Sequence, residues 1–133
     1  MFELTINNKV YNFVFGMGFL RELDPKITKK IDGVTGKVEQ LGVQYAIAGI
    51  IDGDVEDLVN VLDLGNKYSG ATGDERLSRK DIEAFIEDEN TDIEQVFADV
   101  LDFLSKANAT KKKVENLQKA IEEQKAKAEN EQN

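Results

Sequence analysis

The chain has 133 residues, of which 41% are hydrophobic and 32% are charged, and this suits a single domain with one core. Its 26 acidic and 17 basic residues give a net charge of −9, which disfavours nucleic acid and anionic membranes as partners because both bind through Lys and Arg. It contains no Cys and no His, and so lacks the residues most used as general base, thiolate nucleophile and zinc ligand. We expect a protein that is not an enzyme, holds no metal or cofactor and works by binding another protein.

The first ten residues include Glu3 and a single Lys and have no apolar run typical of a signal peptide. No stretch approaches the roughly 20 consecutive apolar residues that span a bilayer. The sequence therefore predicts a soluble, cytoplasmic protein.

Alternating apolar and polar residues on both sides of Asn7-Asn8 predict a β-hairpin over about residues 1–16. Asn tolerates the positive φ that a two-residue type I′ turn requires. A lone hairpin is marginally stable in water, so its apolar face must be covered by the chain's own helices or by a partner. The predicted cross-strand pairs are Phe2 with Phe13, Leu4 with Tyr11 and Ile6 with Lys9.

The next segment predicts two short helical pieces. Apolar residues between positions 19 and 23 favour a helix that stops near Asp24-Pro25. Because Pro is compatible with the first turn of a helix, we expect a brief helical turn through Ile27 and Ile31 before Gly33.

Apolar residues at steps of three and four predict a helix over about residues 36–51 that is buried on more than one side. Asp52-Gly53-Asp54 then predicts a turn, and Asp54 with Asp57 predicts the N-cap of a helix over residues 55–64. The first apolar stripe of the earlier helix comprises Val34, Val38, Leu41, Tyr45 and Ala48, and the second comprises Val43, Ile47, Ile50 and Ile51.

Residues 65–77 contain three glycines without a periodic apolar pattern, which predicts a mobile loop or a helix end followed by a loop. Ser78 with Asp81, and Thr91 with Glu94, each resemble a capping box that opens an amphipathic helix. The predicted core residues of these two helices are Ile82, Phe85, Ile86, Ile93, Val96, Phe97, Val100, Leu101 and Leu104.

The remaining residues, 110–133, form a tail with six Lys and five Glu. Its apolar positions Val114, Leu117 and Ile121 span fewer than two heptads, too few for a coiled coil. We therefore predict a mainly α fold with a small N-terminal hairpin (α+β). It comprises a helical domain over residues 1–109 and a charged tail that is helical or disordered until a partner orders it.

Three short motifs resemble ligand-binding loops but depart from them at the residues that matter. The acidic segment from Asp52 to Asp63 has Asp57 where a calcium loop needs Gly, and ends in Asp rather than a bidentate Glu. Gly16-Met-Gly18 and Gly70-Ala-Thr-Gly73 lack the third Gly of a dinucleotide loop and the Lys of a phosphate loop. We interpret all three as turns and connectors.

Two charged segments leave alternatives open. Residues 81–102 contain nine acidic residues and no basic one, which is typical of a solvated helix face but also of a docking surface for a basic partner or a nucleic-acid mimic that inhibits a DNA-binding protein. Lys111-Lys112-Lys113 is consistent with a basic cluster near the C-terminal end of an acidic helix, where the dipole favours positive charge. Its codons could equally supply an adenine run on which a ribosome slips.

The order of these segments resembles the tail assembly chaperone family of long-tailed, siphovirus-type bacteriophages, over about residues 1–107. The fragments that carry the resemblance are Phe13-Val-Phe15-Gly16, Leu20-Arg-Glu-Leu23, Asp54-Val-Glu-Asp-Leu58, Asp81-Ile-Glu-Ala-Phe-Ile86 and Ile93-Glu-Gln-Val-Phe97-Ala-Asp-Val-Leu101. The resemblance implies a non-enzymatic protein of the infected cell's cytoplasm that is absent from the mature virion. Such a protein binds the tape measure protein, keeps it soluble and helps recruit tail tube subunits, in many members through an extended form made by ribosomal frameshifting.

The resemblance implies no catalytic residues, so candidate partner-binding residues come from the apolar pattern. They are the hairpin face (Phe2, Leu4, Tyr11 and Phe13) and the tail stripe (Val114, Leu117 and Ile121). Self-association and a role as a general acidic adaptor are the alternatives.

Overall fold

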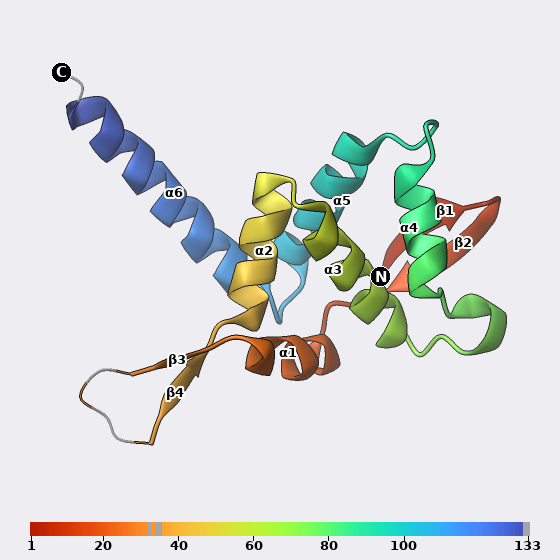
Figure 1. The fold of residues 1–133 in the computed structure, drawn as a ribbon, viewed down its shortest axis with the longest axis horizontal. Helices are drawn as coiled ribbons and strands as arrows, with labels where there is room; N and C mark the ends of the chain where they lie inside the picture. The colour runs from red at the N-terminus through yellow and green to blue at the C-terminus, as the bar shows by residue number, and fades with distance from the viewer. Residues whose placement is uncertain (32, 34–35, 132–133) are drawn as a thin grey trace.

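The computed structural model describes every residue except 32, 34, 35, 132 and 133, so Val34 of the predicted helical stripe lies outside the described residues. The described part is mainly helical with two small antiparallel sheets, which confirms the predicted α+β fold (Figure 1). In chain order the elements are β1 (Phe2–Ile6), β2 (Lys9–Phe13), α1 (Met17–Leu23), the 3-10 turn η1 (Asp24–Lys26), β3 (Thr28–Lys30), β4 (Val38–Gln40), α2 (Gly42–Asp52), α3 (Val55–Lys67), the 3-10 turn η2 (Gly73–Glu75), α4 (Arg79–Glu87), α5 (Ile93–Lys106) and α6 (Lys111–Glu131).

The N-terminal hairpin forms in the predicted register. Asn7 and Asn8 have φ angles of 52° and 65°, as a type I′ turn requires. Phe2 pairs with Phe13 and both are buried, because the apolar face lies against the helices. The backbone N–H of Val14 donates to the carbonyl oxygen of Gly65 at 2.9 Å, which ties the end of the hairpin to α3.

Helix α2 is the hub of the core because it packs against α1, α3, α5 and α6. Its inward face is formed by Val43, Ile47 and Ile50, which are 0–2% exposed. The other stripe, which the periodicity also assigned to the interior, faces outward, and Tyr45 on it is 55% exposed. The helix is therefore buried on one side and open on the other.

The prediction of a helix from about residue 36 is wrong, because α2 begins at Gly42 and Val38–Gln40 forms the strand β4, which pairs antiparallel with β3. The predicted helical turn through Ile27 and Ile31 is wrong for the same reason, since Ile27 is extended (φ −129°, ψ 123°) and η1 ends at Lys26. Gly36 has a φ of 80°, which no α-helix accommodates. We call the described residues from 27 to 41 the hairpin arm, because β3 and β4 project from the helical body (Figure 1).

Capping by short polar side chains places three of the helices. Asp54 and Ser78 accept hydrogen bonds from the N–H groups of Asp57 and Asp81, as predicted. The capping box at Thr91 is wrong by one residue, because Asp92 caps α5 and the Thr91 hydroxyl donates to the carbonyl oxygen of Phe85 instead. Where two short polar residues are adjacent, as Thr91 and Asp92 are, tertiary contacts decide which of them caps the helix.

The segment after α3 is a helix end followed by a loop, and a buried amide holds the loop. Helix α3 extends to Lys67, and Asn66 within it is fully buried. Its amide nitrogen donates to the carbonyl oxygens of Asn12 and Glu75, and its oxygen accepts from the N–H of Leu77 at 2.7 Å. Asn66 thereby joins the hairpin, α3 and the loop.

The tail forms one helix, α6, whose first turn joins the core. Thr110 is buried and its hydroxyl donates to the carbonyl oxygen of Leu104, while Val114 is 1% exposed. Lys111 to Lys113 open α6, where the helix dipole disfavours positive charge, and they also follow shortly after the C-terminal end of the acidic helix α5 at Lys106, where the dipole favours it.

Gly42 fixes the joint between the hairpin arm and the body, and it has no room for a side chain. A Cβ atom there would overlap the backbone carbonyl of Leu23, whereas one at Gly16 would make only an ordinary van der Waals contact with the Val14 side chain, at 3.6 Å. Gly42→Ala should lower the free energy of unfolding by about 1–3 kcal/mol. Gly16→Ala should stay within about 1 kcal/mol of the wild type, because Ala readily adopts the φ of −120° found there. Urea unfolding followed by circular dichroism measures both, and equal midpoints for the two variants would contradict the account.

Candidate functional site

The structure offers no cluster of groups suited to metal binding among its described residues, where no three His, Cys, Asp or Glu side chains gather around a common point. The acidic segment that resembles a calcium loop is a helix start, since Asp54 accepts from the N–H of Asp57 at 3.0 Å. No helix in the described part of the chain is long and apolar enough to cross a membrane.

The hairpin face is divided between core and surface. Phe2 and Phe13 are 4% and 1% exposed, and the ring of Phe2 lies 4.8 Å from that of Phe103 on α5, centroid to centroid. Leu4 and Tyr11 are half-buried and pack against the same core. In this conformation the two Phe side chains are closed to a partner.

The tail stripe runs from the core to the surface. Val114 is buried, whereas Leu117 and Ile121 are half-buried, and the residues from Glu122 to Asn130 are exposed. Helix α6 therefore anchors by its first turns and then extends away from the body (Figure 1). Its half-buried apolar residues lie where it leaves α2.

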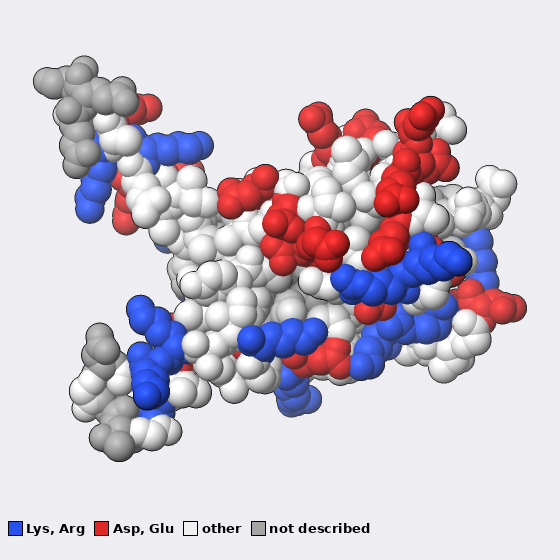
Figure 2. All heavy atoms as spheres, viewed as in Figure 1, with Lys and Arg blue, Asp and Glu red and all other residues white. Residues whose placement is uncertain are grey.

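An open groove of about 300 Å³ lies where α2, the hairpin arm and α6 meet, and we call it the α2–α6 groove. Figure 2 shows the hollow between the two projecting arms, with uncharged atoms at its base. The outward stripe of α2 forms much of its floor. The lining residues are Lys29, Glu39, Leu41, Gln44, Tyr45, Ala48 and Leu117.

The hairpin arm turns a mixed apolar and basic face toward this groove. Side chains alternate between the faces of a strand, so Ile27 and Ile31 share the face of Lys29, which lines the groove. Ile27 is 38% exposed and Ile31 is 41% exposed. Leu41, at the base of the arm, continues this apolar strip onto α2.

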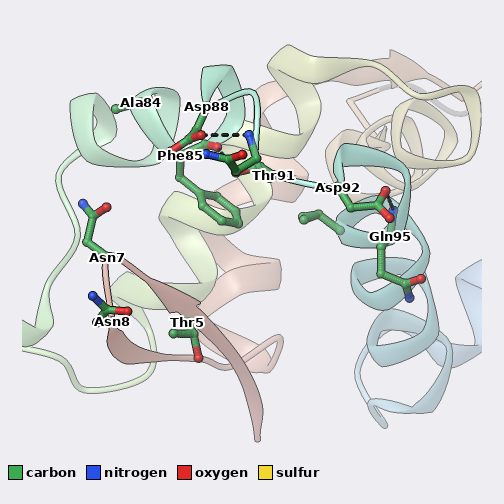
Figure 3. Close-up of a pocket in the computed structure, with 11 residues that line it drawn as sticks. Thr5, Asn7, Asn8, Ala84, Phe85, Asp88, Thr91, Asp92 and Gln95 are labelled. Carbon is green, nitrogen blue, oxygen red and sulfur yellow. Dashed lines mark hydrogen bonds between the residues drawn. The ribbon is translucent and has the colours of Figure 1, made fainter.

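A larger hollow of about 780 Å³ lies between the tip of the N-terminal hairpin and the turn from α4 to α5. Figure 3 shows Asn7 and Asn8 on one side of it and Asp88 and Asp92 on the other. Both carboxylates already serve the local backbone, accepting from the N–H groups of Asn90 and Gln95 at 2.9 and 3.1 Å. This hollow brings together turn and capping residues and no reactive group.

Charge is divided unevenly over the surface. Acidic side chains gather over α4 and α5, whose segment 81–102 holds nine acids and no basic residue, while lysines cover the hairpin arm (Figure 2). Residues 27–41 of the sequence contain three lysines and two acids, and α6 contains six lysines and five glutamates. Each arm that flanks the groove therefore has a small positive net charge on an acidic protein.

One exposed ion pair joins α1 to the end of α3. Lys67 donates to the Glu22 carboxylate, and this hydrogen bond is the main reason that the pKa of Glu22 is lowered and that of Lys67 is raised. The Tyr68 hydroxyl donates to the same Glu22 oxygen at 3.2 Å. Exposure of both charges marks this pair as a local surface contact.

In the sequence, the residues of the groove floor form part of a helical stripe that the periodicity assigns to the core. Leu41, Tyr45 and Ala48 were placed together on one face of a helix, and they do lie together. No feature of the sequence indicates that this face stays open, because residues 36–41 beside it fit the pattern of a helix.

Asp57 provides a pH-dependent test of this account of the helix start. Burial, and then the neighbouring charges of Asp54 and Glu56, raise the pKa of its carboxyl. The ionised form is therefore less favourable in the folded state than in the unfolded one, and this penalty disappears as the pH falls through the raised pKa toward the ordinary value of about 4. The wild type should gain stability relative to Asp57→Asn as the pH is lowered from 7 to 3.

Urea midpoints at several pH values measure this difference. Asp81→Asn, at the equivalent position of α4 but on an exposed side chain, is the matched control, and its difference from the wild type should change less. A constant difference between Asp57→Asn and the wild type over the whole range would contradict the burial of this carboxylate.

Comparison with known proteins identifies the family. Residues 3–119 match the family model described as phage tail assembly chaperone protein, TAC, while no curated protein and no solved structure matches. The matched segment includes the N-terminal hairpin, the hairpin arm, α2 and the anchored part of α6, and so contains every residue that lines the α2–α6 groove. The family model covers most of the chain, and the protein therefore belongs to the phage tail assembly chaperone family.

Proposed function

We propose that this protein acts in the cytoplasm of the infected cell as a non-enzymatic chaperone that binds the tape measure protein and keeps it soluble until the tail tube encloses it. The observation that carries the proposal is the α2–α6 groove, an open hollow with the exposed side chain of Tyr45 in its lining, within the segment that matches the family. On this proposal the chaperone is released during assembly and is absent from the mature virion.

The physical properties of the surface support this role. A chaperone of a long, apolar, helical partner needs an accessible apolar surface bordered by charge, because contiguous exposed apolar patches otherwise cause aggregation. The floor of the groove includes Leu41, Tyr45 and Ala48, and the charged residues Lys29 and Glu39 line it from the hairpin arm. The net charge of −9 keeps a loaded complex soluble by repulsion between copies.

We propose further that the chaperone helps to recruit tail tube subunits, through an extended form made by ribosomal frameshifting. The run from Lys111 to Lys113 supports this mechanism, because consecutive Lys codons can supply the adenines on which a ribosome slips. Their codons are then expected to form an adenine run, with an overlapping reading frame beyond it. The nucleotide sequence checks this directly, and an interrupted run or a closed second frame would exclude it.

Co-expression tests the main proposal. The tape measure protein of the same phage, tagged and expressed alone, should be largely insoluble because its apolar helical surface is uncovered. Co-expressed with the chaperone, it should appear in the soluble fraction and retain the chaperone on affinity purification. The measurement is the soluble fraction of the tape measure protein, quantified on gels.

An unrelated acidic helical protein of similar size serves as the control for charge alone. If it solubilises the tape measure protein equally well, or if the chaperone does not co-purify, the proposed function is wrong.

A further inference from the structure

We infer that the α2–α6 groove binds an amphipathic α-helix of the tape measure protein whose apolar stripe is flanked by acidic residues, with Tyr45 as the central anchor. This inference rests on the proposed function and adds to it the surface, the conformation of the bound segment and the charge that flanks it.

The floor of the groove has the form of a helix-packing ridge. Leu41, Tyr45 and Ala48 follow one another at steps of four and three, the spacing that places side chains in a row along one face of a helix. Tyr45 is 55% exposed although it lies between half-buried apolar neighbours. An aromatic residue in such a position is the type that dominates binding at interfaces, because it buries a large area with few rotatable bonds.

The walls add apolar surface on both sides of this ridge. Leu117 lines the groove from α6, and Ile121 follows it one turn later, half-buried where the helix leaves the body. On the other side, Ile27 and Ile31 share the face of the hairpin arm that carries Lys29. An occupant that contacts a ridge and two walls must be apolar over a broad stripe, which is the helix-in-groove mode of recognition.

The charge of the arms favours acidic residues beside that stripe. Lys29 lines the groove beside its cross-strand partner Glu39, and side-chain alternation places Lys37 on the same face of the arm, so this face carries two lysines and one acid. At the base of the other arm, Lys111 to Lys113 open α6. Complementary charge steers association and fixes the register of a bound segment more than it adds affinity.

A second copy of the chain fits the groove less well than a separate helix. Its acidic segment, residues 81–102, has the complementary charge. However, its larger apolar residues already pack against their own core, Phe85, Ile93 and Phe97 among them. The acidic segment therefore has little uncovered apolar surface with which to fill the groove.

The arm itself should respond to the occupant. Both of its strands, Thr28–Lys30 and Val38–Gln40, are exposed along their whole length, and an isolated two-stranded hairpin is marginally stable in water. A helix lying against one face of the arm would stabilise its backbone hydrogen bonds. Amide hydrogen exchange in the described parts of residues 27–41 should slow in the complex.

Tyr45→Asp and Lys29→Glu test the two components of the site. Each would be compared with a matched change on an exposed residue outside the groove lining, Val55→Asp for the apolar component and Lys80→Glu for the charge. Tyr45→Asp should reduce the tape measure protein captured from the soluble fraction by roughly tenfold or more, as expected for a central aromatic anchor. Val55→Asp should leave capture at the wild-type level.

Lys29→Glu should weaken capture at low ionic strength, and its difference from the wild type should shrink as salt is added, because exposed charges are screened. Lys80→Glu should show no such salt-dependent difference. Thermal unfolding of the purified variants checks that each has folded. A photo-crosslinking residue at position 45 should capture the tape measure protein, and one at position 55 should not.

The outcomes separate this inference from the proposed function. If the wild type solubilises the tape measure protein and Tyr45→Asp does so equally well, the groove is not the binding site and the proposed function stands. If Tyr45→Asp retains capture but lowers the molar mass of the purified protein by light scattering, the groove is an interface between copies, which overturns the inference. If the wild type fails to solubilise the tape measure protein, both are wrong.

Discussion

Helix α2 has apolar residues on two faces but buries only one of them fully in the core, and the groove beside it follows from this. One face, with Val43, Ile47 and Ile50, closes the core against α1, α3, α5 and the start of α6. A helix that is apolar on all sides is stable in water only when its second face also finds cover. The hairpin arm and α6 cover that face in part, and Tyr45 is left largely open.

Both arms are anchored beside α2, which sets the shape of the groove. The hairpin arm is fixed at its base, where the N–H of Leu41 donates to the carbonyl oxygen of Ile27 at 2.8 Å and Asp24 accepts from the N–H of Val43 at 3.0 Å. Helix α6 is fixed by the buried side chain of Val114. Beyond these points the arms project from the body, so the floor of the groove belongs to the packed helix α2 and its walls belong to the two projecting arms (Figure 1).

The parts of the fold that the sequence predicted are those in which local chemistry decides. Asn7 and Asn8 determine the turn, and the turn determines the register of the N-terminal hairpin. Asp54 and Ser78 determine where two helices begin, because a short polar side chain satisfies the free N–H groups of the first turn. These decisions need only three or four neighbouring residues.

The parts that could not be predicted depend on contacts between distant residues. Val38 and Leu41 fit a helical stripe as well as a strand. Only the pairing of β4 with β3, together with the close approach of Gly42 to Leu23, makes α2 begin at residue 42. The outward position of Tyr45 follows from this starting point of the helix. The candidate residues from the hairpin and the tail were apolar for a related reason, since Phe2 and Val114 serve the core.

The uneven distribution of charge over the surface adds a preference for the charge of a bound segment, which the apolar residues of the groove alone would not provide. On our proposal, the lysines of the hairpin arm and of the start of α6 attract a helix with acidic flanks toward the groove, while the acidic segment 81–102 repels it. The apolar residues of the floor then supply the contact area, and the lysines beside it select the charge of the bound segment.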